Sequence, residues 1–209
     1  MTATIKGLYA ITPECADTAA LLDKLRQVLR GGAALVQYRS KSEDLALKHE
    51  QATELLALCR SFHVPLIIND DLRLATLIDA DGVHIGENDA TLKDARINLG
   101  PDKIIGVSCY QDLQRATQFA ALGADYVAFG SFYPSSTKPE AQPCPLSLLT
   151  EAKAKLTVPI VAIGGITTGN APSLIQAGAD AVAVISALFE APDIELAAHH
   201  FTSLFATKH

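Results

Sequence analysis

The sequence of 209 residues has no tryptophan, one methionine and only 6% aromatic residues. Its four cysteines, Cys15, Cys59, Cys109 and Cys144, form no C-x-x-C pair and have no neighbouring histidine at the spacing of a zinc site. We therefore expect four free thiols, without a disulfide framework or structural zinc. Cys109 follows a predicted strand, but a lone cysteine without a paired base is typical of a packing residue, so its reactivity stays open.

The sequence also lacks a long hydrophobic run and a basic block. No stretch of about 18 apolar residues is present, and the first residues have no basic region followed by a long apolar segment. We expect a cytoplasmic protein without a membrane partner. The 17 basic and 23 acidic side chains give a net charge of −6 and no cationic cluster, which argues against a nucleic-acid partner. No linker divides the chain, so we expect one domain over residues 1–209.

Eight short runs of apolar and β-branched residues recur along the chain and predict eight strands. Segments with apolar residues every three or four positions separate them and predict amphipathic helices. Near-continuous apolar strands that alternate with helices are typical of a parallel sheet. The predicted strands lie within residues 7–12, 33–39, 64–70, 81–86, 103–108, 124–130, 158–165 and 180–186.

Eight such units, with a last helix near 194–205, favour a closed (β/α)₈ barrel, the TIM barrel, over an open doubly wound sheet. The first strand is not followed by G-x-G-x-x-G, which weakens a dinucleotide-binding interpretation. The longest gap between strands contains a segment rich in serine and proline, residues 131–145, which is a candidate lid.

The active site of such a barrel lies at the carboxyl ends of its strands, and polar residues or glycines follow seven of the eight predicted ends. Each of them alone is also compatible with a solvated strand end. Their joint occurrence favours a ligand site. They are Gln37, Arg39, Lys41, Asn69, Asp70, Asp71, His84, Asp89, Ser108, Ser135, Ser136, Thr137, Lys138, Gly164, Gly165 and Ser186.

Two of these residues, Asp70 and Asp89, follow successive strands and have the hard oxygen ligands that Mg²⁺ prefers. Both also precede a predicted helix, so each could instead be a helix cap. Together with Arg39, Lys41 and Lys138 they describe a clamp for a leaving diphosphate. Gln37, Arg39 and Lys41 share one strand face if the strand extends that far.

The last two strands predict a second anion site. AIGGITTGN and AVISALF begin helices directly after their strands, where backbone N–H groups of barrels commonly bind phosphate. The alternative is that Gly164 and Gly165 only permit a tight turn.

Other chemistries lack their residues. The sequence has no G-x-S-x-G, H-E-x-x-H or Walker motif. A Schiff-base aldolase would need a lysine inside the barrel, but Lys6 and Lys103 both precede their strands. The role of His84 stays open, since the direction of its side chain is not fixed by the sequence.

Eight motifs, in order along nearly the whole chain, resemble the thiamine-phosphate synthase family. They are LYAIT, VQYRSK, INDDLRLA, DGVHIGENDA, IIGVS, VAFGSFYPSSTKP, AIGGIT and AVISAL. The resemblance implies a Mg²⁺-dependent barrel enzyme with two small-molecule substrates. It would join 4-amino-2-methyl-5-pyrimidinylmethyl diphosphate to a thiazole phosphate, or to its carboxylated precursor, and release diphosphate. Whether the chain forms a homo-oligomer is left open.

The resemblance also assigns residues. It implies Asp70 and Asp89 as metal ligands, and Arg39, Lys41, Ser108 and Lys138 as the residues that act in catalysis. The pyrimidine diphosphate site would comprise Gln37, Arg39, Lys41, Asn69, Ser108 and Lys138. The thiazole phosphate site would comprise Ser135, Ser136, Thr137, Gly165, Ile185 and Ser186.

Two alternatives remain beside this interpretation. Related barrels that only tautomerise the thiazole phosphate lack the full metal and lysine set, which is present here as Asp70, Asp89, Lys41 and Lys138. A barrel that only senses phosphate would have no need of a clamp for a leaving group. Turnover that releases diphosphate would distinguish a synthase from a tautomerase and from a phosphate-sensing barrel.

Overall fold

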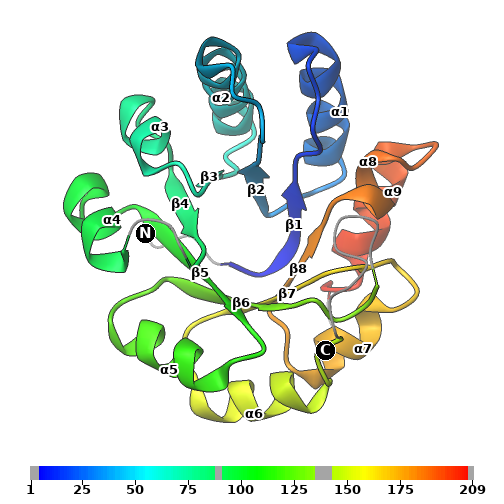
Figure 1. The fold of residues 1–209 in the computed structure, drawn as a ribbon. Coiled ribbons are helices and arrows are strands. Elements are labelled where there is room, and N and C mark those ends of the chain that lie inside the picture. The colour runs from blue at the N-terminus through cyan, green and yellow to red at the C-terminus, as the bar shows by residue number, and fades with distance from the viewer. Residues whose placement is uncertain (1–4, 88–90, 135–142, 207–209) are drawn as a thin grey trace.

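Eight parallel strands close into a barrel, which confirms the fold expected from the sequence (Figure 1). The computed structural model describes residues 5–87, 91–134 and 143–206. Strand β8 pairs with β1, with Gly7 opposite Ala181, and this pairing closes the barrel. All eight strands fall inside the predicted segments or overlap them: β1 Gly7–Ile11, β2 Leu35–Tyr38, β3 Leu66–Asn69, β4 Gly82–Ile85, β5 Ile104–Tyr110, β6 Tyr126–Gly130, β7 Ile160–Ile163 and β8 Ala181–Val184.

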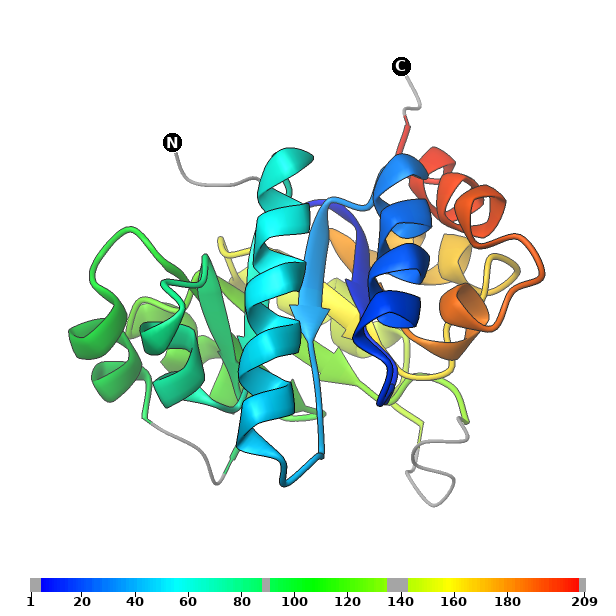
Figure 2. The same cartoon turned by 90° about the horizontal axis from the view of Figure 1, so that it is seen from above.

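Helices cover the outside of the barrel, as Figure 2 shows from the side. The short helix α8 begins two residues after the end of β8, where the AVISALF motif predicted a helix start. The last helix lies where it was expected. The helices are α1 Thr18–Arg30, α2 Leu45–Ser61, α3 Leu72–Leu77, α4 Leu92–Leu99, α5 Leu113–Ala121, α6 Ser147–Lys155, α7 Ala171–Ala177, α8 Ser186–Phe189 and α9 Ile194–Ser203.

Alternation along each strand divides the core into two layers. In β1, Leu8 and Ala10 face the helices, whereas Tyr9 and Ile11 face the barrel interior. The interior layer also contains Tyr126. A side chain at Gly106 would collide with the ring of Tyr126, so the glycine makes room for a large aromatic side chain inside the barrel.

None of the helices in the described part of the chain is long and apolar enough to cross a membrane. Asp17 and Asp71 cap the helices α1 and α3, since their carboxylates accept hydrogen bonds from the backbone N–H groups of Ala20 and Leu74.

Candidate active site

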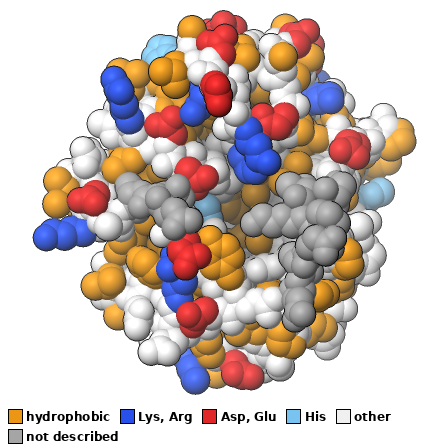
Figure 3. All heavy atoms as spheres, viewed as in Figure 1, with side chains coloured by type: hydrophobic (Ala, Val, Ile, Leu, Met, Phe, Trp, Pro, Cys, Tyr) orange, Lys and Arg blue, Asp and Glu red, His pale blue; other side chains and the backbone are white. Residues whose placement is uncertain are grey.

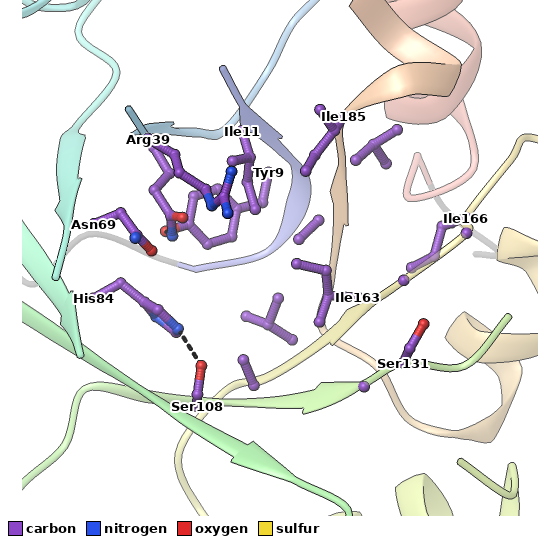
Figure 4. A pocket seen from close by; sticks show the side chains of 18 of the residues that line it. Tyr9, Ile11, Arg39, Asn69, His84, Ser108, Ser131, Ile163, Ile166 and Ile185 are labelled. Carbon is purple, nitrogen blue, oxygen red and sulfur yellow. Dashed lines mark hydrogen bonds between the residues drawn. The ribbon is translucent and has the colours of Figure 1, made fainter. Parts of the chain in front are cut away.

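A pocket of about 800 Å³ opens at the carboxyl ends of the strands. Figure 3 shows this face of the molecule, hollowed near its centre and surrounded by acidic and basic side chains. The volume lies within the range usual for ligand sites. Polar side chains come from one side of the barrel, and aliphatic side chains with glycine backbone come from the other (Figure 4).

On the polar side, β2 contributes Gln37 and the residue after its end, Arg39. Gln37 is almost fully buried, and Arg39 forms an ion pair with Glu14 at 3.6 Å. Lys41 is exposed and does not line the pocket. The expected alternation does not reach it because β2 ends at Tyr38.

Asp70 and Asp71 have different roles, which the sequence left open. Asp70 lines the pocket and accepts a hydrogen bond of 2.6 Å from the amide of Asn69. Asp71 caps α3 and forms an ion pair of 3.0 Å with Lys48. Burial alone would raise the pKa of Asp71, but the hydrogen bond from the Leu74 N–H and the contact with Lys48 outweigh it and lower that pKa. Asp71 is the cap, and Asp70 lines the pocket.

Two of the four non-glycine residues with positive φ in the described ranges, Asp70 and Tyr110, line the pocket. The φ of Asp70, 61°, lies in the left-handed region, which most side chains avoid at a cost on the order of 1 kcal/mol. Tyr110, which also lines the pocket, has a φ of 53° and follows an irregular register between β5 and β6. Strain of this kind is concentrated at functional sites.

The donor set fits Mg²⁺ in part. Asp70 and Glu87 line the pocket with carboxylate oxygens, and Mg²⁺ usually takes one or two carboxylates and completes its shell with water and substrate oxygens. Within the described ranges, no group of three or more acidic, histidine or cysteine side chains could hold a metal by itself. The second predicted ligand, Asp89, lies outside the described residues.

Ser108 on β5 lines the pocket and is the last member of a chain of hydrogen bonds that includes four buried residues. His84 Nε2 and Ser108 Oγ are 2.8 Å apart, the dashed contact in Figure 4, and His84 Nδ1 lies 2.9 Å from the hydroxyl of Tyr126. The hydroxyls of Tyr126 and Tyr9 are 2.7 Å apart, and Gln37 Nε2 donates to Tyr9 at 2.7 Å. A continuous hydrogen-bonded chain therefore joins Gln37 to Ser108 beneath the pocket.

The other side of the pocket is built largely from backbone. Gly164 and Gly165 follow β7 with φ values of 103° and 61°, and a side chain on either would collide with the segment that contains Ser131 and Pro134. Ile185 and Ser186 line the pocket where β8 passes into α8. The two glycines therefore let the end of β7 pack closely against the segment with Ser131 and Pro134 at the wall of the pocket.

Several predicted site residues cannot be placed. Ser135, Ser136, Thr137 and Lys138 lie outside the described residues, together with most of the candidate lid at 131–145. Their assigned contacts and the closure of the lid remain predictions.

The sequence analysis missed Tyr9, Tyr126 and Glu87 as residues of this site. Tyrosines on apolar strands count as hydrophobic in a periodicity pattern, although a buried hydroxyl needs a hydrogen-bond partner. That need is the signal that could have identified the two tyrosines. Cys109 is fully buried, and burial raises the pKa of its thiol to about 12, which agrees with a packing role.

Comparison with known proteins decides the family. A family model described as thiamine monophosphate synthase matches residues 8–188. The chain belongs to the thiamine-phosphate synthase family. It is 57% identical over 202 residues to the thiamine-phosphate synthase of Thiobacillus denitrificans, covering 97% of this chain and 96% of the relative. The thiamine-phosphate synthase of Methylobacillus flagellatus is 56% identical over 201 residues, with 96% of both chains covered.

Solved structures of this family have the same barrel. The thiamine phosphate pyrophosphorylase from Pyrococcus furiosus superposes with a TM-score of 0.86 at 31% identity, over 98% of this chain and 97% of the other. These likenesses place the chain among enzymes of thiamine biosynthesis.

Proposed function

We propose that the protein is a transferase that joins the aminopyrimidine diphosphate to a thiazole phosphate and releases diphosphate. The observation that carries this proposal is one pocket with two unlike sides. A cation, amides and a carboxylate suit a diphosphate with a bound metal ion, and the glycine backbone near Gly165 and Ser186 suits a phosphate. The two relatives from Thiobacillus denitrificans and Methylobacillus flagellatus are thiamine-phosphate synthases, which supports the same reaction.

The described residues bind and orient the substrates rather than attack them. No cysteine or lysine lines the pocket among the residues that the structure describes, and the proposed reaction needs no nucleophilic side chain. An electron-rich aminopyrimidine stabilises the cation that remains when diphosphate leaves, and the thiazole nitrogen then attacks that carbon. Dissociative substitution of this kind needs close placement of the two ligands and stabilisation of the leaving group.

The leaving group is the demanding part of the reaction. The guanidinium of Arg39 and the hydroxyl of Ser108 are placed to interact with an anion in the pocket. Asp70, with Asp89 outside the described residues, would hold a magnesium ion. That ion would supply positive charge to the departing diphosphate. We further propose that Lys138 adds charge as the diphosphate separates, and that the enzyme acts in the cytoplasm.

The proposal is tested by incubating the purified protein with both substrates and Mg²⁺ and measuring product mass and released diphosphate. We expect thiamine phosphate and diphosphate in equal amounts, and neither when one substrate is omitted. Conversion of the thiazole phosphate alone, without diphosphate release, would instead indicate a tautomerase. Binding of both ligands without any product would contradict an enzymatic role.

A further inference from the structure

The chain of hydrogen bonds beneath the pocket has only two consistent arrangements of protons. Each tyrosine hydroxyl has one proton, and a neutral imidazole has one N–H. Burial raises the pKa of Tyr9 and of Tyr126, so both hydroxyls are neutral at ordinary pH. A tyrosine oxygen can accept two hydrogen bonds, but a hydroxyl that accepted from both of its neighbours in the chain would leave its own proton without an acceptor in that chain. If both tyrosine protons are donated within the chain, the direction of donation is the same from one end to the other.

The amide of Gln37 sets that direction. Its Nε2 faces the Tyr9 hydroxyl, so Tyr9 accepts from Gln37 and donates to Tyr126. Tyr126 then donates to Nδ1 of His84, and the proton of the imidazole is on Nε2. His84 donates to Ser108 Oγ, which leaves the hydroxyl proton of Ser108 for the pocket.

The reverse direction would have the opposite result. It requires the Gln37 carbonyl to face Tyr9, a proton on Nδ1 of His84, and a Ser108 hydroxyl that donates to Nε2. Ser108 would then offer only lone pairs to the pocket. The oxygens of an anionic diphosphate accept hydrogen bonds, so a Ser108 hydroxyl that donates suits this ligand.

The ring positions are fixed by packing. The rings of His84 and Tyr126 stack with centroids 5.6 Å apart and an interplanar angle of 21°. The rings of Tyr9 and Tyr126 meet edge to face at 5.9 Å. Both tyrosine side chains are almost fully buried, which limits their freedom to move. The hydrogen bonds therefore join rigid partners.

We propose that His84 is a positioning residue: a neutral imidazole with its proton on Nε2, which accepts from Tyr126 and holds the hydroxyl proton of Ser108 toward the ligand. The identity of the ligand rests on the proposed function, but the direction of the hydrogen bonds does not. His84 itself acts through Ser108.

The direct test is ¹⁵N NMR of the wild-type protein without substrate. The chain has six histidines, and the signals of His84 are assigned by their loss in His84→Gln. We expect a proton on Nε2 and none on Nδ1. A proton on Nδ1, or on both nitrogens, would overturn the proposal. Because no turnover is involved, this result stands or falls separately from the proposed reaction.

Two variants test the positioning role through kinetics. The side-chain amide nitrogen of glutamine can take the place of Nε2, whereas that of asparagine lies nearer the place of Nδ1. We expect His84→Gln to keep kcat within about tenfold of wild type and His84→Asn to lose about 100-fold, the effect of one charge-assisted hydrogen bond. The KM for the thiazole phosphate should be unchanged in both. Equal kcat values for two folded variants would overturn the role of Nε2.

A buried tyrosine outside the chain of hydrogen bonds provides the matched control. Tyr38 donates to Gln51 at 2.9 Å and is as buried as Tyr126 to within a few per cent of its surface. Tyr38→Phe should leave the His84 nitrogen signals and kcat at wild-type values, whereas Tyr126→Phe should shift those signals. Unchanged His84 signals in a folded Tyr126→Phe would show that Tyr126 does not set the tautomer.

Discussion

The two ends of the barrel use aspartate in opposite ways. At the amino end, Asp81, Asp125 and Asp180 precede β4, β6 and β8, and each carboxylate accepts from the backbone N–H of a neighbouring strand at 2.7–2.9 Å. Each is also paired with a basic side chain. At the carboxyl end, Asp70 lines a pocket from a strained backbone.

This difference between the two ends of the barrel indicates that residues for stability and residues for function lie at opposite ends of the barrel axis. At the amino end, an aspartate that accepts a hydrogen bond from a neighbouring strand and pairs with a basic side chain stabilises the barrel. An aspartate at the other end is held next to space for a ligand. Substitutions at the two ends should therefore move different measured quantities.

The largest effect is expected at the carboxyl end. Asp70→Asn keeps a residue that tolerates the left-handed backbone but removes the charge for Mg²⁺, so kcat should fall about 100-fold or more. The melting temperature should stay within about 2 °C of wild type. Asp71→Asn keeps a good helix cap outside the pocket and serves as the control. Wild-type turnover by Asp70→Asn across a Mg²⁺ titration would exclude Asp70 as a ligand.

The complementary effect belongs to the amino end. Asp125 accepts from Arg96 and from the Ile105 N–H, both at 2.7 Å. Asp125→Ala should lower the free energy of unfolding by about 2 kcal/mol, because a backbone N–H and a guanidinium lose their acceptor. Urea denaturation measures this, and kcat at 25 °C should not change.

An exposed ion pair provides the control for that measurement. Asp23 contacts Arg26 at 2.8 Å on the surface of α1, and Asp23→Ala should cost less than about 0.5 kcal/mol. If Asp125→Ala were no more destabilising than Asp23→Ala, the amino-end carboxylates would not have the structural role given to them here.

A smaller effect is expected on the glycine side of the pocket. Gly165→Ala adds a side chain at positive φ against Pro134, which should raise the KM for the thiazole phosphate about tenfold. Gly169→Ala meets only Thr167 at 3.7 Å and should leave that KM unchanged. Steady-state kinetics at saturating diphosphate substrate compare the two, and similar KM values would argue against close approach of the ligand at Gly165.

The last comparison is between two cations after β2, and it includes the smallest expected effect, that of Lys41→Ala. Arg39 lines the pocket, so Arg39→Ala should raise the KM for the diphosphate substrate about tenfold. Lys41 is exposed, and solvent and salt weaken its interaction, so Lys41→Ala should change the KM about threefold or less. A larger change for Lys41 than for Arg39 would show that Lys41 reaches the ligand.

The sequence predicted the fold well because strand and helix periods repeat over the whole chain. Eight predicted strands, each separated from the next by a segment long enough for one helix, leave few arrangements other than a barrel. The carboxyl ends of these strands then locate the pocket. The location of Gln37, Arg39, Asn69, Asp70 and Ser108 at one mouth follows from those ends alone.

What the sequence did not predict depends on contacts between distant residues. Tyr9 and Tyr126 are 117 positions apart and meet only when the barrel closes. Lys41 lies off the pocket because β2 ends at Tyr38, a boundary that no residue type marks. The sequence left open whether Asp70 is a helix cap, and the structure gives that role to Asp71, because α3 begins at Leu72.

The central claim is that one pocket binds two substrates on two unlike sides. Calorimetric titration of each substrate into Asp70→Asn and Gly165→Ala, with Mg²⁺ present, tests it most directly. The account predicts that Asp70→Asn weakens binding of the pyrimidine diphosphate alone and that Gly165→Ala weakens binding of the thiazole phosphate alone. Equal losses of affinity for both ligands in both variants would contradict it.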